Sequence, residues 1–258
     1  MLELRHVHGG YGGPDILKDV SCAFPPGGSY CVLGPNGCGK TTLLRVMAGL
    51  IAHRGEVLLD GRDVSGMKRR DLAARIAVMS QINATYFSYS VYDTVMLGRY
   101  QHIRGGFFAH PGAQDREVVE RVLASTGLSD LRDRQIDELS GGQRQRVFLA
   151  HALAQDPEII LLDEPTKHLD VKHQVELIDY LTRWSADGRH TVIGVLHDVN
   201  LALRLSSQVL FMKEGRIVRQ GNFHEIADAP FLESVYGMDL AAFMLSSLQN
   251  WQVLQASR

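Results

Sequence analysis

The sequence has little of what marks secreted, membrane-spanning or nucleic-acid-binding proteins. Its three cysteines, Cys22, Cys31 and Cys38, form no Cys-x-x-Cys pair, so no disulfide framework is indicated. The formal net charge of −2 gives no overall basic footprint for nucleic acid. No apolar run approaches the roughly 18 residues of a membrane-spanning helix, and the first residues do not resemble a signal peptide. We therefore expect a reduced, cytoplasmic protein with no nucleic-acid partner.

What is present has the composition of an ordinary folded domain. Hydrophobic residues make up 45% and charged residues 22% of the 258 residues. A chain of this length buries roughly 70–75% of its unfolded surface, so it needs no disulfide or metal ion to fold. Strand-like and helical periodicities alternate along it, which favours an α/β fold.

The periodicity also predicts where individual elements lie. In the strand expected at 2–8, Leu2, Leu4, His6 and His8 share one face. Asp115 is expected to cap a helix, and the end of the chain is expected to form short helices. The remaining segments are strands at 30–33, 76–79, 159–162 and 191–196, a hairpin at 209–220, and mostly helix between 81 and 150.

A glycine-rich loop lies between the strand at 30–33 and a helix. Residues 34–41, Gly-Pro-Asn-Gly-Cys-Gly-Lys-Thr, match the phosphate-binding pattern G-x-x-x-x-G-K-[ST]. Glycines let backbone amides turn towards an anion, and the following helix points its positive end at it. We expect Lys40 to reach the β- and γ-phosphates and the Thr41 hydroxyl to bind Mg²⁺. The expected phosphate-binding loop comprises Gly34, Pro35, Asn36, Gly37, Cys38, Gly39, Lys40, Thr41 and Thr42.

The role of Cys38 inside this loop has two interpretations. In the simpler one, Cys38 is a small residue whose backbone serves the loop. The alternative is a redox or alkylation switch.

Two acids follow the most apolar strand of the sequence. Asp163 and Glu164 come directly after the run Ile159 to Leu162. Beside a phosphate loop, Asp163 can hold Mg²⁺ through water, and Glu164 has the position of a general base for an attacking water. The alternative is a pair of acids that merely end a strand.

The segment Leu139-Ser140-Gly141-Gly142-Gln143 resembles the signature motif of the ATP-binding cassette (ABC) ATPases. A serine and two glycines at a helix start offer a hydroxyl and backbone amides to a phosphate. The resemblance implies a P-loop ABC cassette of α/β class, with a RecA-like parallel-sheet core, an N-terminal antiparallel β part and an inserted helical subdomain. It also implies a homodimer, because in the family the signature serves the nucleotide held by the other subunit.

Further segments resemble other elements of this family, in the family's order. Tyr11 resembles the aromatic residue that stacks on adenine, although plain packing is the alternative. Gln81 resembles the glutamine that reaches Mg²⁺ and the attacking water, and His197 resembles the switch histidine at the γ-phosphate. His168, Leu169 and Asp170 resemble the D-loop, which crosses the dimer interface.

The sequence differs from the family pattern at two positions. Lys167 stands where small residues such as serine are common, and His151 stands where arginine is frequent. The resemblance predicts one nucleotide-binding domain over 1–258, with the core at 1–82 and 155–225, a helical subdomain at about 83–154 and a short helical tail at about 226–258.

The closest functional resemblance is to separate ATPase subunits of bacterial importers. Segments 94–102 and 196–202 resemble importers of ferric siderophores, haem, vitamin B12 and related metal or oxyanion ligands. This implies ATP hydrolysis by Glu164, His197, Gln81 and Lys40, with ATP and with Mg²⁺ held by Thr41, Gln81 and Asp163. The implied partners are two polytopic membrane permease subunits and, indirectly, a substrate-binding protein, at the cytoplasmic face of the inner membrane.

Two alternatives accompany this resemblance. The aromatic residues Tyr86, Phe87 and Tyr89 either line a groove for a helix of the membrane subunit or belong to the helical core. The chain as a whole could instead be a soluble, non-transport ABC ATPase, for example of the iron–sulfur assembly type.

Overall fold

The computed structural model describes residues 1–79, 89–103, 110–167 and 169–256, and these form two β-sheets with helices around them. The first sheet is antiparallel, in the order β2-β1-β4-β5. Its strands are β1 (Leu2–Gly9), β2 (Leu17–Phe24), β4 (His53–Leu59) and β5 (Arg62–Asp63). This is the N-terminal antiparallel part that the family resemblance implies.

The second sheet has the order β10-β9-β3-β8-β7-β6, and its inner strands are parallel. Only the hairpin of β9 and β10 at one edge is antiparallel. The fold class expected from the sequence is therefore confirmed. The strands are β3 (Ser29–Leu33), β6 (Ile76–Met79), β7 (Ile159–Asp163), β8 (Thr191–Val195), β9 (Gln208–Lys213) and β10 (Arg216–Asn222).

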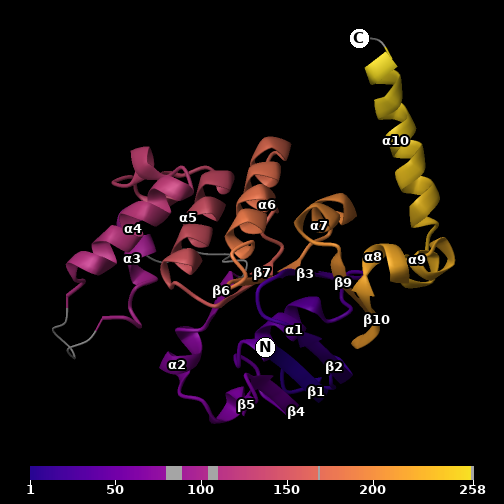
Figure 1. Cartoon of the computed structure of the whole chain (residues 1–258), viewed down its shortest axis with the longest axis horizontal. Helices are drawn as coiled ribbons and strands as arrows, with labels where there is room; N and C mark the ends of the chain where they lie inside the picture. Colours follow the sequence, from indigo (N-terminus) through magenta and orange to yellow (C-terminus); the bar gives the residue numbers. More distant parts are fainter. Residues whose placement is uncertain (80–88, 104–109, 168, 257–258) are drawn as a thin grey trace.

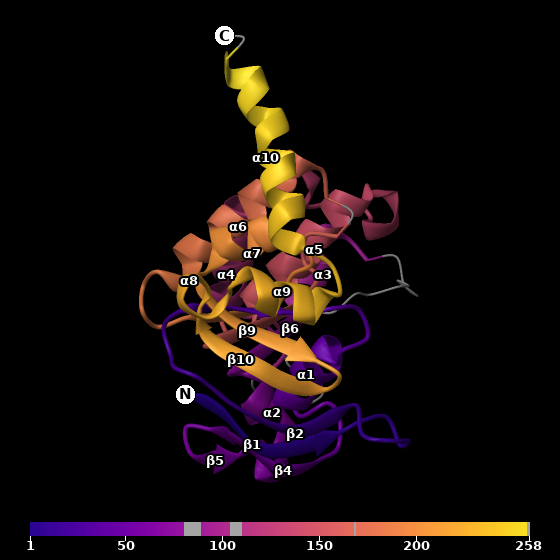
Figure 2. The ribbon, with the colours of Figure 1, turned by 90° about the vertical axis from the view of Figure 1, so that its right-hand side faces the viewer.

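Helices cover both faces of the second sheet. Because side chains alternate along a strand, Val32 of β3 faces α1 (Lys40–Met47) and the antiparallel sheet, whereas Cys31 and Leu33 face the opposite layer. That opposite layer contains α5 (Gly141–Ala154), α6 (Val171–Ser185), α7 (Val199–Leu205) and α9 (Ala229–Tyr236). Figure 2 shows α1 between the two sheets.

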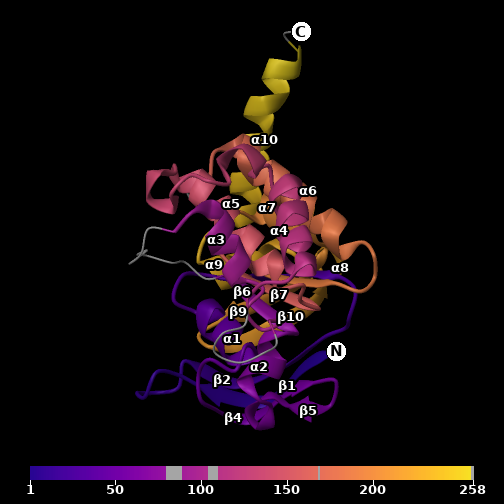
Figure 3. The same ribbon diagram turned by 90° about the vertical axis from the view of Figure 1, so that its left-hand side faces the viewer.

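A group of helices lies beside the β6 edge of the second sheet, away from the antiparallel sheet (Figures 1 and 3). It consists of α3 (Val91–Leu97), α4 (Ala113–Ser125) and α5, which share a separate apolar cluster. The unusual His151 belongs here: its Nδ1 donates to the Thr94 carbonyl at 3.0 Å, and burial lowers its pKa. His151 therefore joins α5 to α3. The domain boundaries themselves stay a prediction.

The expectation that His6 shares a face with Leu2 and Leu4 was wrong. Leu2 and Leu4 are buried, but the pairing of β1 shifts between Leu4 and Val7, and His6 has φ of 48°. This bulge turns Val7 into the core in place of His6, whose Nδ1 instead lies 2.8 Å from Asp19 Oδ1 at the surface.

Two helix predictions also need correction. Helix α4 begins at Ala113 after Gly112, so Asp115 is its third residue rather than its cap, and its Oδ2 accepts from the Gly112 amide at 3.0 Å. At the C-terminal end, α8 (Phe223–Ile226) and α9 are short, but α10 (Leu240–Ala256) has 17 residues and projects from the body (Figure 1). No helix in the described part of the chain is long and apolar enough to cross a membrane.

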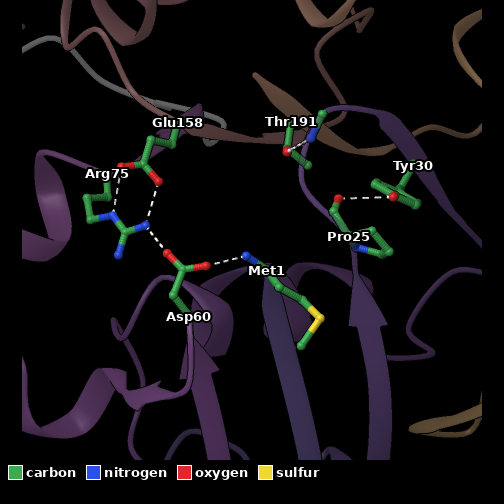
Figure 4. A network of polar contacts seen from close by, with 8 residues as sticks. Met1, Pro25, Tyr30, Asp60, Arg75, Glu158 and Thr191 are labelled. Atoms are coloured by element: carbon green, nitrogen blue, oxygen red, sulfur yellow. Dashed lines mark hydrogen bonds and ion pairs between the residues drawn. The ribbon is translucent and has the colours of Figure 1, made fainter. Parts of the chain in front are cut away.

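A cluster of Arg75, Asp60 and Glu158 joins the edges of the two sheets (Figure 4). Arg75, between α2 (Arg69–Ala73) and β6, donates from Nε to Glu158 at 2.9 Å and also binds Asp60 in the β4–β5 turn. The hydrogen bonds that Arg75 donates to both carboxylates raise its pKa, so the guanidinium stays charged. The cluster holds the antiparallel sheet against the strand that leads to Asp163.

Candidate nucleotide-binding site

The phosphate loop connects β3 to α1, as the sequence predicts. Gly34, Gly37 and Gly39 have φ of 147°, 76° and 107°, a region in which other residues are strained. Gly34 is further constrained, because a Cβ there would lie 2.1 Å from the Met212 carbonyl oxygen of β9. Gly39 caps α1 in a left-handed conformation, so the helix begins at Lys40 with its amides towards the loop.

The side chain of Lys40 lies inside the loop. It is 6% exposed, and its Nζ donates to the carbonyls of Gly34 and Pro35 at 2.8 and 2.9 Å. These carbonyls hold the ammonium at the place where a polyphosphate would meet it.

Cys38 is buried in the same loop. Burial raises the pKa of its thiol, and Lys40 only partly opposes this. A protonated, buried thiol is a poor nucleophile, which favours the backbone role over a switch.

Thr41 and Asp163 meet at the carboxyl ends of β3 and β7. The Thr41 hydroxyl donates to Asp163 Oδ1 at 3.1 Å, and Asp163 is 7% exposed. Burial raises the pKa of Asp163, partly offset by this hydrogen bond. A hydroxyl beside a buried carboxylate is the oxygen donor set that Mg²⁺ prefers, so the residues present fit this ion.

Glu164 follows in a left-handed conformation, with φ of 52°, and each oxygen of its carboxylate contacts a nitrogen of another side chain. His197 Nε2 lies 2.5 Å from Oε1, and Lys167 Nζ lies 3.1 Å from Oε2. Burial alone would raise the pKa of Glu164, but these two neighbours together lower it. The carboxylate is therefore ionised at neutral pH.

Two adjoining hollows open at these residues. The phosphate hollow, of about 220 Å³, is lined by Asn36, Gly37 and residues 39–42 of the loop together with Ile16, Glu164 and His197. The outer hollow, of about 550 Å³, shares Glu164 and His197 and adds Lys167, Gln174 and Asp198. The structure thus brings Glu164 and His197, 33 residues apart in sequence, to the phosphate loop.

Tyr11 stands at the surface of the molecule near α1. It is 56% exposed, its hydroxyl accepts from Arg45 Nη1 at 3.1 Å, and the Arg45 guanidinium lies 5.7 Å from the ring centroid. A Tyr11 ring that is mostly exposed does not support the alternative that Tyr11 only packs against the core. Arg45 and Ile16 were not among the predicted site residues. The available signal for Arg45 was its position four residues after Thr41, on the same face of the expected helix.

The signature segment forms a helix start, as expected. Ser140 caps α5: its Oγ accepts from the Gln143 amide at 3.2 Å, and the Gln143 side chain accepts from the Ser140 amide at 3.0 Å. A Cβ on Gly142 would lie 3.3 Å from Leu169, and Asp170 caps α6 through the His173 amide at 2.9 Å. Leu139 is buried, whereas Ser140 and Gly141 are exposed.

The structure does not bring the signature into either hollow. Among the described residues, the lining of both hollows includes none from Leu139 to Gln143. The exposed Ser140 and Gly141 are thus open to a second molecule. Gln81, His168, Tyr86 and Phe87 lie outside the described residues, and Tyr89 is 45% exposed.

Comparison with known proteins places this geometry in a family. The family model described as "ABC transporter" matches residues 17–167, more than half of the chain. The chain belongs to the ABC transporter family. Among curated ABC proteins, it is 39% identical to the ferric enterobactin transport ATP-binding protein FepC of Escherichia coli over 89% of this chain and 84% of FepC. It is 36% identical to the iron(3+)-hydroxamate import ATP-binding protein FhuC of Bacillus subtilis, over 89% and 85% of the two chains.

Solved ABC structures share the fold. A transporter assigned to the metal-chelate type, in an inward-facing conformation, has a TM-score of 0.79 with 28% identity, covering 92% of this chain and 89% of that one. A dimeric ATP-binding cassette bound to ADP and Pi has a TM-score of 0.76 with 29% identity, covering 86% and 98%. This chain is therefore an ATP-binding cassette of an ATPase.

Proposed function

We propose that this ABC ATPase energises a bacterial importer of ferric siderophores or a related metal chelate. The observation that carries the proposal is the similarity to FepC and FhuC over 89% of this chain, since their names give transport of ferric enterobactin and import of iron(3+)-hydroxamate. The ligand need not touch this subunit, so its identity rests on the relatives and not on the hollows.

The phosphate loop and Lys40 bind the triphosphate of ATP. The glycine amides surround the phosphates, and the buried Lys40 ammonium leaves the carbonyls of Gly34 and Pro35 for phosphate oxygens. Tyr11, with Arg45 beside it, offers an exposed ring to the adenine.

Glu164 and His197 perform the hydrolytic step. The ionised Glu164 carboxylate accepts a proton from a water molecule whose oxygen bonds to the γ-phosphorus, while the bond from that phosphorus to the bridging oxygen breaks and ADP leaves. His197, one hydrogen bond away, orients Glu164 and stabilises the charge that develops on the phosphate. Gln81 contributes to the same water by resemblance to the family.

Thr41, Asp163 and Gln81 would hold Mg²⁺. When bound, this ion neutralises charge on the β- and γ-phosphates. The close approach of the Thr41 hydroxyl to the buried Asp163 carboxylate supports the assignment of these two residues.

Two copies of the chain complete each site. Ser140, Gly141 and Gly142 lie at an exposed helix start outside the hollows, and so can cap the γ-phosphate held by the partner copy. Leu169 and Asp170 of the D-loop would face the partner copy. The dimer acts on two polytopic permease subunits at the cytoplasmic face of the inner membrane, with a substrate-binding protein delivering the ligand.

The test combines co-purification and turnover. The chain is purified from native membranes in mild detergent, and ATP hydrolysis and uptake of ferric hydroxamate and ferric enterobactin are measured. Glu164→Gln should retain ATP binding, lose hydrolysis and accumulate as an ATP-bound dimer. Turnover at the wild-type rate in this variant contradicts the general-base role.

The matched control is Glu176→Gln, the same chemical change at a residue that is 55% exposed and lines neither hollow. A polytopic membrane partner in the purified complex supports transport. Recovery of a soluble partner alone would favour the non-transport alternative.

A further inference from the structure

Lys167 departs from the family pattern. In the structure its ammonium lies beside the carboxylate of Glu164, the residue proposed as the general base. Its Nζ lies 3.1 Å from Glu164 Oε2, on the opposite oxygen from His197. Lys167 also lines the outer hollow with Glu164 and His197. A serine at this position would carry no charge to set beside the carboxylate.

The backbone that carries Lys167 is held from several directions. Its amide donates to the Glu164 carbonyl at 3.2 Å, which closes a turn and returns the lysine side chain towards Glu164. Gln145 of α5 donates to the Pro165 carbonyl at 3.0 Å, and Gln174 of α6 donates to the Thr166 carbonyl at 3.2 Å. The reach of the ammonium is therefore set by the fold.

The ion pair fixes the orientation of the carboxylate. With His197 on Oε1 and Lys167 on Oε2, rotating Glu164 to direct an oxygen at a water would break a charged contact. We propose that Lys167 is a positioning residue that restrains the Glu164 carboxylate in the resting subunit and so lowers the rate of ATP turnover. This inference rests on the proposed ATPase function of Glu164.

The restraint is weak enough to be released in each cycle. The side chain of Lys167 is 46% exposed and that of Glu164 is 20% exposed, so water screens the pair. A polyphosphate on the adjacent loop brings negative charge towards the shared hollow and competes for the ammonium. Binding of ATP thus loosens the contact that restrains the base.

The experiment measures steady-state ATP hydrolysis by the complex purified from membranes, with three substitutions of one residue. Lys167→Ser and Lys167→Met should raise kcat by about two- to five-fold, the range expected for a screened ion pair, and change KM for ATP less than two-fold. Lys167→Arg, which keeps the charge, should return kcat to near the wild-type value.

A matched control is available on α6. Lys172, 79% exposed and 3.8 Å from Glu176, forms a surface pair away from both hollows, so Lys172→Ser should leave kcat unchanged. An unchanged or lower kcat in both Lys167→Ser and Lys167→Met overturns the restraint, as does a change confined to KM. So does a Lys167→Arg variant that behaves like Lys167→Ser.

Glu164→Gln separates this inference from the proposed function. If the wild type hydrolyses ATP, Glu164→Gln does not, and the lysine variants match the wild type, then only the restraint fails. If the wild type has no ATPase activity, or Glu164→Gln hydrolyses ATP normally, the proposed function fails and the restraint fails with it. Thermal melting of each variant checks that the fold is retained.

Discussion

Replacing Gly34 by alanine should damage both the fold and the nucleotide site. A Cβ at this position would lie 2.1 Å from the Met212 carbonyl oxygen, far inside van der Waals contact, and the backbone has φ of 147°. Met212 belongs to β9, the neighbour of β3, so relief requires the two strands to separate or the loop to move. Backbone strain and this displacement together should lower the free energy of unfolding by about 3–5 kcal/mol.

Gly61→Ala is the matched control for the backbone alone. Gly61 also has positive φ, at 77°, but a Cβ there meets no atom within 4 Å, and it lies in the β4–β5 turn away from the loop. The substitution Gly61→Ala should lower the free energy of unfolding by about 1 kcal/mol. For a chain of this size, 1 kcal/mol lowers Tm by about 2–4 °C, so Gly34→Ala should melt roughly 6–20 °C below the wild type.

The assay is thermal unfolding with and without MgATP. Gly61→Ala should keep the wild-type stabilisation by nucleotide, whereas Gly34→Ala should lose most of it because the loop amides no longer converge. The reasoning from the Met212 contact is refuted by two results together. These are a free energy of unfolding for Gly34→Ala within about 1 kcal/mol of that for Gly61→Ala, and ATP binding by Gly34→Ala with the wild-type Kd.

Two further predictions concern the rest of the site. Burial raises the pKa of Asp163, so the folded protein binds a proton on this carboxyl more tightly than the unfolded chain does. The free energy of unfolding therefore falls as pH rises from the unfolded pKa of this group through its folded pKa. Asp163→Asn should therefore raise Tm at pH 7 while abolishing Mg²⁺-dependent hydrolysis; a lower Tm at pH 7 with an unchanged Tm near pH 3 would contradict this sign. Tyr11→Ala should raise KM for ATP about five-fold, from a stacking contribution of about 1 kcal/mol, while Tyr11→Phe should bind ATP normally; equal KM values for both variants and the wild type would exclude adenine stacking.

Local structure near the phosphate loop was predictable because the sequence signals there are local. An apolar run, glycines at positive φ and a helical stripe determine strand, loop and helix within about twenty residues. The same holds for the hairpin of β9 and β10, whose turn contains Gly215. The acids after β7 were recognisable because carboxyl ends of parallel strands share one edge of a sheet.

Other features depend on contacts between distant segments or on small shifts in register. The bulge at His6 moves one residue across the sheet, and alternation alone cannot show it. The contact between Lys167 and Glu164 depends on how two helices hold a turn, and Arg45 reaches Tyr11 from another element. The length of α10 was missed because its apolar residues, including the exposed Phe243, Leu248 and Trp251, show no clear one-sided stripe.

The position of β3 has a consequence for synthesis of the chain. This strand, which leads into the phosphate loop, pairs with β8 and β9, and both follow it by more than 150 residues. At roughly 5–20 residues per second, a ribosome needs about 10–35 s to complete these partners. Throughout that interval β3 lacks both of the strands it pairs with, so the phosphate loop cannot take its folded place in the second sheet until β8 and β9 have been made.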